Sequence, residues 1–423
     1  MKNTQKQAQK RQQAQTAAAV VGVDAGKLKH ALVVRPRGGQ DSKAFVFDTT
    51  RAGFEAAVEW IRSATGGAVH GEVLIGIEFA GVYGFTLAHY LNQQGFRVVS
   101  VLAAHTKKWK EVTHGQSLKT DPKDAQTITD LVGNGNFVTF PFLKPAYADL
   151  RHLISARDRL SMLRSGTVSR LRATLQTVFP EFERIFKAVD KPTAMALLHA
   201  FPSPDDLLKA SRRRVLARLD KASRGHLGTE TYESLMEAAR ASVALPGAQS
   251  ALKGEVRLLL EQIAFYRKQM KALEEHMAKT LAELPEAECL LSIPGVAPVS
   301  AATFLGLIGD PRAYESSHQI LRLAGLSLVE HSSGQHRGQK RISKRGRPLL
   351  RKQAFMLALR SVRSDGIFRE QFTAMLNRNG GKKKKAIVAL SRYMLRLMYS
   401  VAREQRLYTA EVPNAPRTEV ADQ

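Results

Sequence analysis

The chain has 423 residues with a formal net charge of +26 at pH 7, and 44% of its residues are hydrophobic. This length leaves room for two or three domains with cores of their own, and the charge favours nucleic acid over a membrane surface as the partner. The single cysteine excludes an internal disulfide and a cysteine-based zinc site, and no apolar run approaches the roughly 20 residues of a transmembrane helix.

The N-terminal part is predicted to be an α/β fold behind a basic tail. Residues 1–18 are mostly Gln, Lys, Arg and Ala, a composition that predicts disorder. Apolar runs bounded by turn residues predict strands at residues 19–23, 30–34, 43–47, 73–77 and 96–102. Helical periodicity follows the third and the fourth of these strands. Three successive strands followed by alternating helix and strand indicate a mixed sheet.

Two acidic residues end predicted strands, and two more open a predicted helix. Asp24 follows the first strand and Glu78 the fourth, so their side chains face each other if those strands are neighbours. Asp121 and Asp124 lie three residues apart beside Pro122, at a helix start, and therefore share one helix face. Four gathered carboxylates repel unless cations or shared protons compensate them. The pattern predicts a site for Mg²⁺, which takes oxygen ligands and retains water positions for phosphate.

Each of these acids also fits an ordinary structural role when it is taken alone. Asp121 and Asp124 suit the N-cap and the first turn of a helix. Asp24 suits a strand-end turn beside Gly26, and Glu78 suits a partly buried pair with a lysine. The metal site is the interpretation that accounts for all four together.

The middle of the chain is predicted to be helical. Residues 147–178 carry leucines at helical spacing and arginines that indicate either a solvated face or contacts with nucleic acid. A second long helix carries a heptad seam typical of a coiled coil. Its seam residues are Leu252, Val256, Leu259, Ile263, Tyr266, Met270, Leu273 and Met277. The partner of this seam is either the first long helix or another subunit.

The last part of the chain is predicted to be mainly helical and strongly basic. A Pro294-Gly295 turn between two helical runs fits either a helix-hairpin-helix that meets phosphate or a plain helical turn. Residues 337–352 contain no acidic residue, and arginine binds phosphate bidentately. The predicted nucleic-acid-binding residues are Arg337, Lys340, Arg341, Lys344, Arg345, Arg347 and Arg351.

The N-terminal motifs resemble those of the DEDD-type insertion-sequence transposases. The resemblance is carried by VGVD at residues 21–24, GIE at residues 76–78 and KTDPKDA at residues 119–125. It implies an RNase H-like (RuvC-like) domain related to Holliday-junction resolvases, with an acidic tetrad that uses Mg²⁺ or Mn²⁺. The catalytic and metal-binding tetrad falls on Asp24, Glu78, Asp121 and Asp124.

The C-terminal segment resembles the transposase domain of the same family. The resemblance is carried by IPG at residues 293–295, AGL at 324–326, SG at 333–334 and ISKRG at 342–346. It implies that Ser333 is the catalytic nucleophile, with the neighbouring Ser332 as the open alternative. Leu328 stands where the family commonly has a proline.

The resemblance implies a DNA transposase or site-specific recombinase that cuts and rejoins DNA through a phosphoserine intermediate. The implied partners are donor and target DNA and a structured bridge RNA that pairs with both. A composite site shared between subunits implies a homo-oligomer, as a dimer and as a tetramer in the synaptic complex. The expected location is the prokaryotic cytoplasm at the nucleoid, with no membrane, and a single cysteine fits that reducing compartment.

Two other functions remain open from the residues alone. A metal-dependent junction nuclease that uses water would need only the four acids, and Ser333 would then be a turn residue. A non-catalytic nucleic-acid scaffold would need only the basic charge.

The predicted organisation has five parts. They are a disordered basic tail at residues 1–18, an RNase H-like catalytic domain at 19–145, a helical and coiled-coil region at 146–285, a transposase domain with the serine nucleophile at 286–405, and a disordered tail at 406–423.

Overall fold

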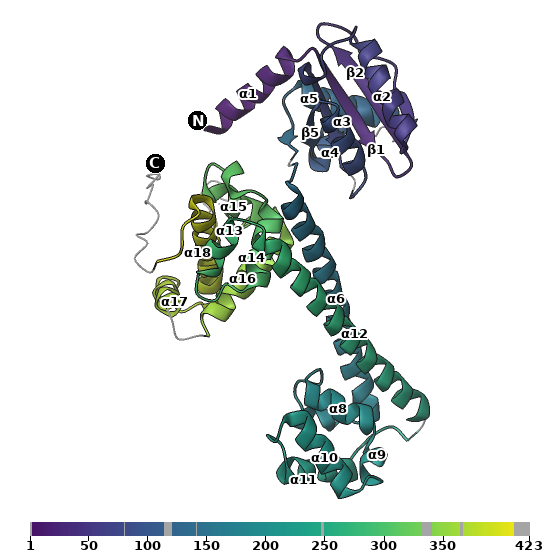
Figure 1. The fold of residues 1–423 in the computed structure, drawn as a ribbon, viewed down its shortest axis with the longest axis vertical. Helices are drawn as coiled ribbons and strands as arrows, with labels where there is room; N and C mark the ends of the chain where they lie inside the picture. Colours follow the sequence, from purple (N-terminus) through teal and green to yellow (C-terminus); the bar gives the residue numbers. More distant parts are fainter. Residues whose placement is uncertain are drawn as a thin grey trace. The chain divides into compact units, whose positions relative to one another are not determined.

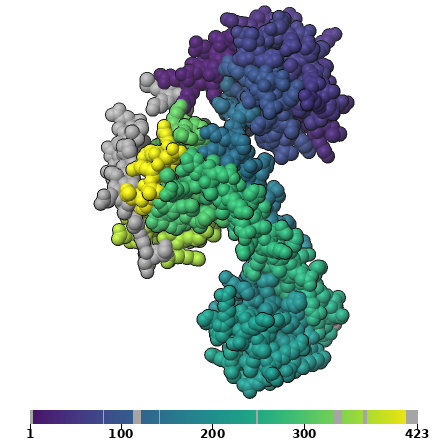
Figure 2. Space-filling model, viewed as in Figure 1, coloured from purple at the N-terminus to yellow at the C-terminus, as the bar shows by residue number. Residues whose placement is uncertain are grey.

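A computed structural model describes residues 2–79, 81–113, 121–140, 142–246, 249–330, 341–363 and 367–409. The chain divides into two compact units, Met1–Phe142 and Leu143–Gln423 (Figures 1 and 2). The first unit contains a six-stranded sheet, and the second is mostly helical. In the described ranges, no helix is both long and apolar enough to span a membrane.

A mixed sheet forms the centre of the first unit, as the sequence predicts. Its strands are β1 (Ala19–Ala25), β2 (Lys29–Pro36), β3 (Phe45–Asp48), β4 (Val73–Glu78), β5 (Arg97–Val101) and β6 (Val138–Thr139), in the spatial order β3-β2-β1-β4-β5-β6. β1, β2 and β3 form two antiparallel hairpins. β4 runs parallel to β1 and β5, and β6 runs antiparallel to β5. β1 and β4 are therefore the neighbours at which the hairpins meet the parallel crossovers.

Helices cover both faces of this sheet (Figure 1). They are α2 (Arg51–Ala64), α3 (Phe85–Gln93), α4 (Ala103–Thr113) and α5 (Asp121–Gly133), with a short 3₁₀ turn at His70–Glu72. α2 and α3 pack on the face that carries Val21, and α5 packs on the face that carries Val20. A Cβ atom on Gly22 would lie 2.3 Å from the Ala125 carbonyl oxygen, so this glycine lets α5 lie directly on β1. α4 follows β5 and contacts α5.

The N-terminal segment departs from the prediction of a disordered tail, because α1 spans Lys2–Thr16. Gln7 Nε2 donates a hydrogen bond to the Gly135 carbonyl oxygen at 3.2 Å, and Lys10 Nζ donates to the Phe137 carbonyl oxygen at 2.6 Å. Ala14 is 7% exposed and joins the apolar cluster beneath α5. These partners lie far away in sequence, so composition alone misses them. Residues 410–423 of the predicted C-terminal tail lie outside the described residues.

Two long helices, α6 (Pro145–Val178) and α12 (Gln249–Ala282), pack side by side in the second unit (Figure 1). They run antiparallel. The start of α6 shares one apolar core with the end of α12, and the end of α6 shares a second apolar core with the start of α12. Leu150 and Met277 belong to one core, whereas Leu175 and Val256 belong to the other. The heptad seam of α12 therefore has a partner within the same chain.

Shorter helices surround each end of this helix pair. Between α6 and α12 lie α7 (Phe182–Ile185), α8 (Pro192–Ala200), α9 (Pro204–Leu208), α10 (Arg212–Ser223) and α11 (Thr229–Arg240). After α12 lie α13 (Glu286–Leu291), α14 (Pro298–Ile308), a 3₁₀ turn at Pro311–Ala313, α15 (Ser317–Ala324), β7 (Leu328–Val329), β8 (Arg341–Ile342), α16 (Pro348–Ser361), α17 (Ile367–Arg378) and α18 (Lys383–Glu404). The core formed by these C-terminal helices also contains Tyr147 and Leu281, so it extends across the predicted boundary at residues 285 and 286.

Candidate functional site

Four carboxylates converge at one edge of the sheet in the first unit. Asp24 at the end of β1 is the register partner of Glu78 at the end of β4. Paired residues on parallel strands point to the same side, and alternation along β1 puts Asp24 on the same face as Gly22. That face is covered by α5, which begins at Asp121 and carries Asp124 in its first turn. The glycine contact therefore fixes the helix that brings the second pair of acids to the first.

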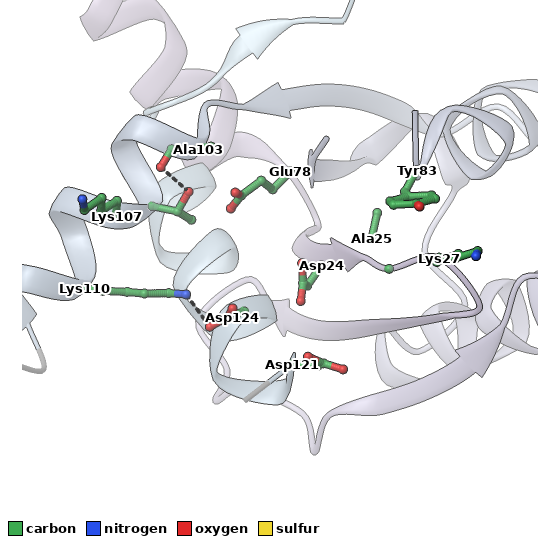
Figure 3. A pocket seen from close by; sticks show the side chains of 12 residues that line it. Asp24, Ala25, Lys27, Glu78, Tyr83, Ala103, Lys107, Lys110, Asp121 and Asp124 are labelled. Carbon is green, nitrogen blue, oxygen red and sulfur yellow. Dashed lines mark hydrogen bonds and ion pairs between the residues drawn. The ribbon is translucent and has the colours of Figure 1, made fainter. Parts of the chain in front are cut away.

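The four side chains line a cavity of about 370 Å³ (Figure 3). Asp24, Glu78, Asp121 and Asp124 share this lining with Tyr83, Thr106, Lys27, Lys107 and Lys110. Asp124 is the most enclosed of the acids, with 7% exposure. The volume is several times the roughly 30 Å³ that a water molecule occupies in the liquid, so the cavity has room for a hydrated cation.

The cavity lining carries more acidic than basic side chains. The pKa of Asp24 is raised from 3.8 to about 6, first by burial and then by the charges of Asp124, Asp121 and Glu78 in that order of importance. Lys110 acts in the opposite direction on the pKa of Asp24. It also forms an ion pair with Asp124 Oδ1 (Figure 3).

The donor set of this cavity fits a divalent cation. All four acids offer carboxylate oxygens, which are the ligands that Mg²⁺ and Mn²⁺ prefer. An ammonium group already stands against one of these oxygens, so the cavity accepts positive charge. Within the described part of the chain, no three acidic, histidine or cysteine side chains are arranged closely enough to hold a metal ion as they stand.

α4 contributes lining residues that no sequence motif indicates. Thr106 and Lys107 each lie about one turn before Lys110, so the three residues share one side of this helix. α4 was not predicted because Trp109 is almost its only large apolar side chain, so the helical period is weak. The available signal was the pair of lysines three residues apart, directly after a strand that ends beside Glu78.

The segment with the predicted nucleophile, residues 331–340, lies outside the described residues, and so do Ser332, Ser333, Arg337 and Lys340. It joins β7 to β8, which pair Leu328 with Ile342 and Val329 with Arg341. The position at which the family commonly has a proline is therefore a strand position in this chain.

The other predicted nucleic-acid-binding residues fall into two groups. Arg341, Lys344 and Arg345 are exposed. Arg351 instead donates hydrogen bonds to the carbonyl oxygens of Ala324 and Lys344, at 3.0 and 3.2 Å. Arg347 is partly buried, and burial lowers the pKa of its guanidinium below the usual range. Arg351 therefore supports the local backbone, whereas the exposed group is available to a ligand.

A strongly basic chain whose α/β unit gathers four carboxylates in one cavity has the features of an enzyme that acts on nucleic acid. Comparison with known families identifies which one. A model of the IS110-type DEDD transposases, described as Transposase, matches residues 21–180, and a model described as Transposase IS116/IS110/IS902 family matches residues 287–373. The chain belongs to the IS110 family of DEDD transposases, and its activity is that of a DNA transposase or recombinase.

Two relatives match nearly the whole chain, and a third matches a shorter part of it. An uncharacterized 44.8 kDa protein of insertion element IS116 from Streptomyces clavuligerus is 26% identical over 402 residues, which is 95% of this chain and 98% of that protein. An uncharacterized 42 kDa protein of insertion element IS900 from Mycobacterium paratuberculosis is 28% identical over 92% of this chain and 96% of its own length. A pilin gene-inverting protein of Moraxella lacunata is 30% identical over a shorter stretch, 30% of this chain and 39% of that protein.

Proposed function

We propose that this transposase cuts and rejoins DNA strands through a covalent phosphoserine at Ser333, with a divalent cation held by Asp24, Glu78, Asp121 and Asp124. The observation that carries the proposal is the gathering of these four carboxylates in one cavity. Such a cation, Mg²⁺ or Mn²⁺, would polarise the phosphate and help deprotonate the attacking hydroxyl. The mixed sheet, with its hairpins followed by parallel strands, supports an RNase H-like, RuvC-like unit around it.

The chemistry assigned to Ser333 conserves the number of phosphodiester bonds. Its Oγ forms an ester with the DNA phosphorus while one phosphorus–oxygen bond to a sugar breaks, and the leaving sugar oxygen takes a proton. A sugar hydroxyl of another strand then attacks the phosphoserine, and Ser333 recovers its proton. A serine hydroxyl is a weak nucleophile until a base or a metal activates it, so the acidic cavity and Ser333 have to work together.

Nucleic-acid partners follow from the charge and the family. The net charge of +26 supports simultaneous binding of donor DNA, target DNA and a bridge RNA that reads both by base pairing. Arg341, Lys344 and Arg345 are exposed and hold phosphates in this proposal. The protein works as a homo-oligomer in the prokaryotic cytoplasm at the nucleoid, and subunits share the tetrad and the serine.

The proposal is tested with the purified full chain, its co-purifying RNA and labelled DNA that carries the ends of its own element. We expect a protein–DNA adduct on a denaturing gel, with the modified peptide assigned to Ser333 by mass spectrometry. Ser333→Ala abolishes the adduct and the cleavage, whereas Ser332→Ala retains both. Retained cleavage by both serine variants would instead identify a metal-dependent junction nuclease that uses water. Unchanged activity of Asp24→Ala and Asp124→Ala would contradict the acidic site itself.

A further inference from the structure

One lysine is held by an ion pair inside the acidic cavity. Lys110 reaches from α4 to α5, where its Nζ forms an ion pair with Asp124 Oδ1 (Figure 3). The Asp124 side chain is 9% exposed and that of Lys110 27%, so solvent screens this pair less than a surface pair. Charge-assisted hydrogen bonds of this kind are among the stronger polar contacts in proteins.

The same lysine acts on the cavity as a whole. No described hydrogen bond joins Asp24 to Lys110. The negative charge of Asp24 is nevertheless stabilised by Lys110 and destabilised by the three neighbouring acids. Lys107 lines the cavity one turn earlier on α4 and is exposed, without a described ion pair. Lys110 is therefore the positive group most closely engaged with the four carboxylates.

A divalent cation bound by Asp124 would compete with Lys110 for the same carboxylate oxygen. A hard cation binds Asp124 through carboxylate lone pairs, and an ammonium that donates to Oδ1 occupies them. A lysine side chain can give up such a position at low steric cost, because its charge sits on a flexible four-carbon stem. Removal of the ammonium would leave an uncompensated acidic cavity unless another cation replaced it.

We propose that Lys110 is a built-in counterion of the acidic cavity: it pairs with Asp124 in the metal-free protein and is displaced when a divalent cation enters. Lys110 thereby lowers the affinity of the cavity for the metal and holds the metal-free unit together. This inference rests on the proposed metal-binding role of the four acids, but concerns a residue that the proposed chemistry does not use.

A purely structural ion pair between α4 and α5 makes a different prediction. If Lys110 only ties the two helices together, its removal lowers stability equally with and without metal and leaves the metal affinity unchanged or weaker. If Lys110 is a counterion, its removal lowers stability in chelator alone, and saturating metal restores it. The two roles therefore separate in the metal affinity and in the metal dependence of unfolding.

The experiment is calorimetric titration of the full chain with MnCl₂ or MgCl₂ alone, together with thermal unfolding in EDTA and in saturating metal. Lys110→Met is expected to bind Mn²⁺ roughly tenfold more tightly than the wild type, because one charge-assisted hydrogen bond no longer competes. Lys110→Arg keeps the cation and is expected to bind like the wild type. Lys108→Met removes a charge from the same helix outside the cavity lining and serves as the matched control.

Each outcome bears on a different claim. If the wild type binds Mn²⁺, Asp24→Asn abolishes binding, and Lys110→Met binds no more tightly than Lys108→Met, the counterion role is overturned while the metal site stands. If neither the wild type nor Lys110→Met binds metal, the proposed metal site fails and the counterion role fails with it. A Lys110→Met protein that unfolds in EDTA but melts like the wild type in Mn²⁺ supports the counterion role even where the metal-free variant is too unstable to titrate.

Discussion

Asp24 and Glu78 are register partners on β1 and β4, the two parallel strands at the centre of the sheet. The pairing gives them a common face, and α5 covers that face with Asp121 and Asp124 at its first turn. Two acids thus come from strand ends and two from a helix start, so the cavity depends on how closely the helix lies on the sheet. Substitutions that alter either the charge of these acids or the contact of α5 with the sheet should change the properties of the cavity.

The charge of Asp24 is predicted to oppose folding of the metal-free protein. Its raised pKa, about 6, means that the folded state holds the proton more tightly than the unfolded state, whose pKa is near 3.8. Folding stability from this group is therefore lost as the pH rises from about 4 to about 6. Asp24→Asn should stabilise the metal-free first unit above pH 6 by about 1–2 kcal/mol, a figure discounted for partial exposure.

Tryptophan fluorescence during thermal unfolding in EDTA measures this effect selectively, because both tryptophans, Trp60 and Trp109, lie in the first unit. The advantage of Asp24→Asn should shrink below pH 6 and vanish near pH 4. A difference that stays constant from pH 4 to pH 8 would show that charge is not its cause.

Gly22→Ala is predicted to lift α5 from β1. The added Cβ would lie 2.3 Å from both the Ala125 carbonyl oxygen and the Thr129 nitrogen, and these backbone atoms cannot move independently of the helix. Overpacking of this kind typically costs about 1–3 kcal/mol, and Mn²⁺ affinity should fall with it. Tryptophan fluorescence and Mn²⁺ titration measure the two effects. Gly71→Ala is the control, since nothing lies within 4 Å of its added Cβ, and equal behaviour of both variants would refute the prediction.

Tyr147→Phe is predicted to destabilise the C-terminal core of the second unit. Glu286 is completely buried, and the Tyr147 hydroxyl lies 3.1 Å from both of its carboxylate oxygens, to which it donates its single proton. Without that donor the buried carboxylate keeps, among the described residues, only Arg312, whose Nη2 lies 4.0 Å from Oε1, and loses its hydrogen bond, which typically costs about 1–3 kcal/mol. Circular dichroism during thermal unfolding measures the loss, and Tyr147→Phe with Glu286→Leu should recover part of it. A single variant as stable as the wild type would contradict the assignment.

Two helical glycines provide a matched pair with opposite expected signs. Gly166 lies in α6 with nothing within 4 Å of an added Cβ, so Gly166→Ala should stabilise the second unit by up to about 1 kcal/mol. Gly306 lies in α14, where the added Cβ would meet Ile154 Cδ1 at 2.5 Å, so Gly306→Ala should destabilise. Helical circular dichroism reports both, and stabilisation by Gly306→Ala would refute the packing of α14 on α6.

Much of the first unit can be predicted because its strands are short apolar runs bounded by turn residues. The strand that ends at Glu78 is predicted from such a run, whereas its place beside β1 comes from the register of the sheet. α4 is not predicted because its apolar period is weak, and α1 is not predicted because its contacts are with segments far away in sequence. Lys10, for example, is held by the Phe137 carbonyl oxygen, which no local pattern reveals.

The candidate site was predictable in its acids but not in its basic residues. The four acids lie at strand ends or at a helix start, and turn residues and Pro122 mark these positions in the sequence. They are Asp24, Glu78, Asp121 and Asp124. The lysines that follow the strand beside Glu78 indicate basic neighbours, but which of them reaches Asp124 depends on where α4 lies against α5. The heptad seam around Val256 was likewise clear, but the identity of its partner was not, since a seam fits a helix of its own chain or of another.

α6 and α12 pair antiparallel, and both contribute to the C-terminal core. The chain leaves this core near Ile154 on α6 and returns to it near Met277 on α12, so the helices between them lie outside it. That arrangement constrains how related transposases can vary in length. Residues added to α6 have to be matched by residues added to α12. Steps of about seven residues keep the apolar seam on the same face of each helix. We therefore expect gaps in this region to come in matched pairs, so that the helix pair can lengthen or shorten while the core at its base keeps the same contacts.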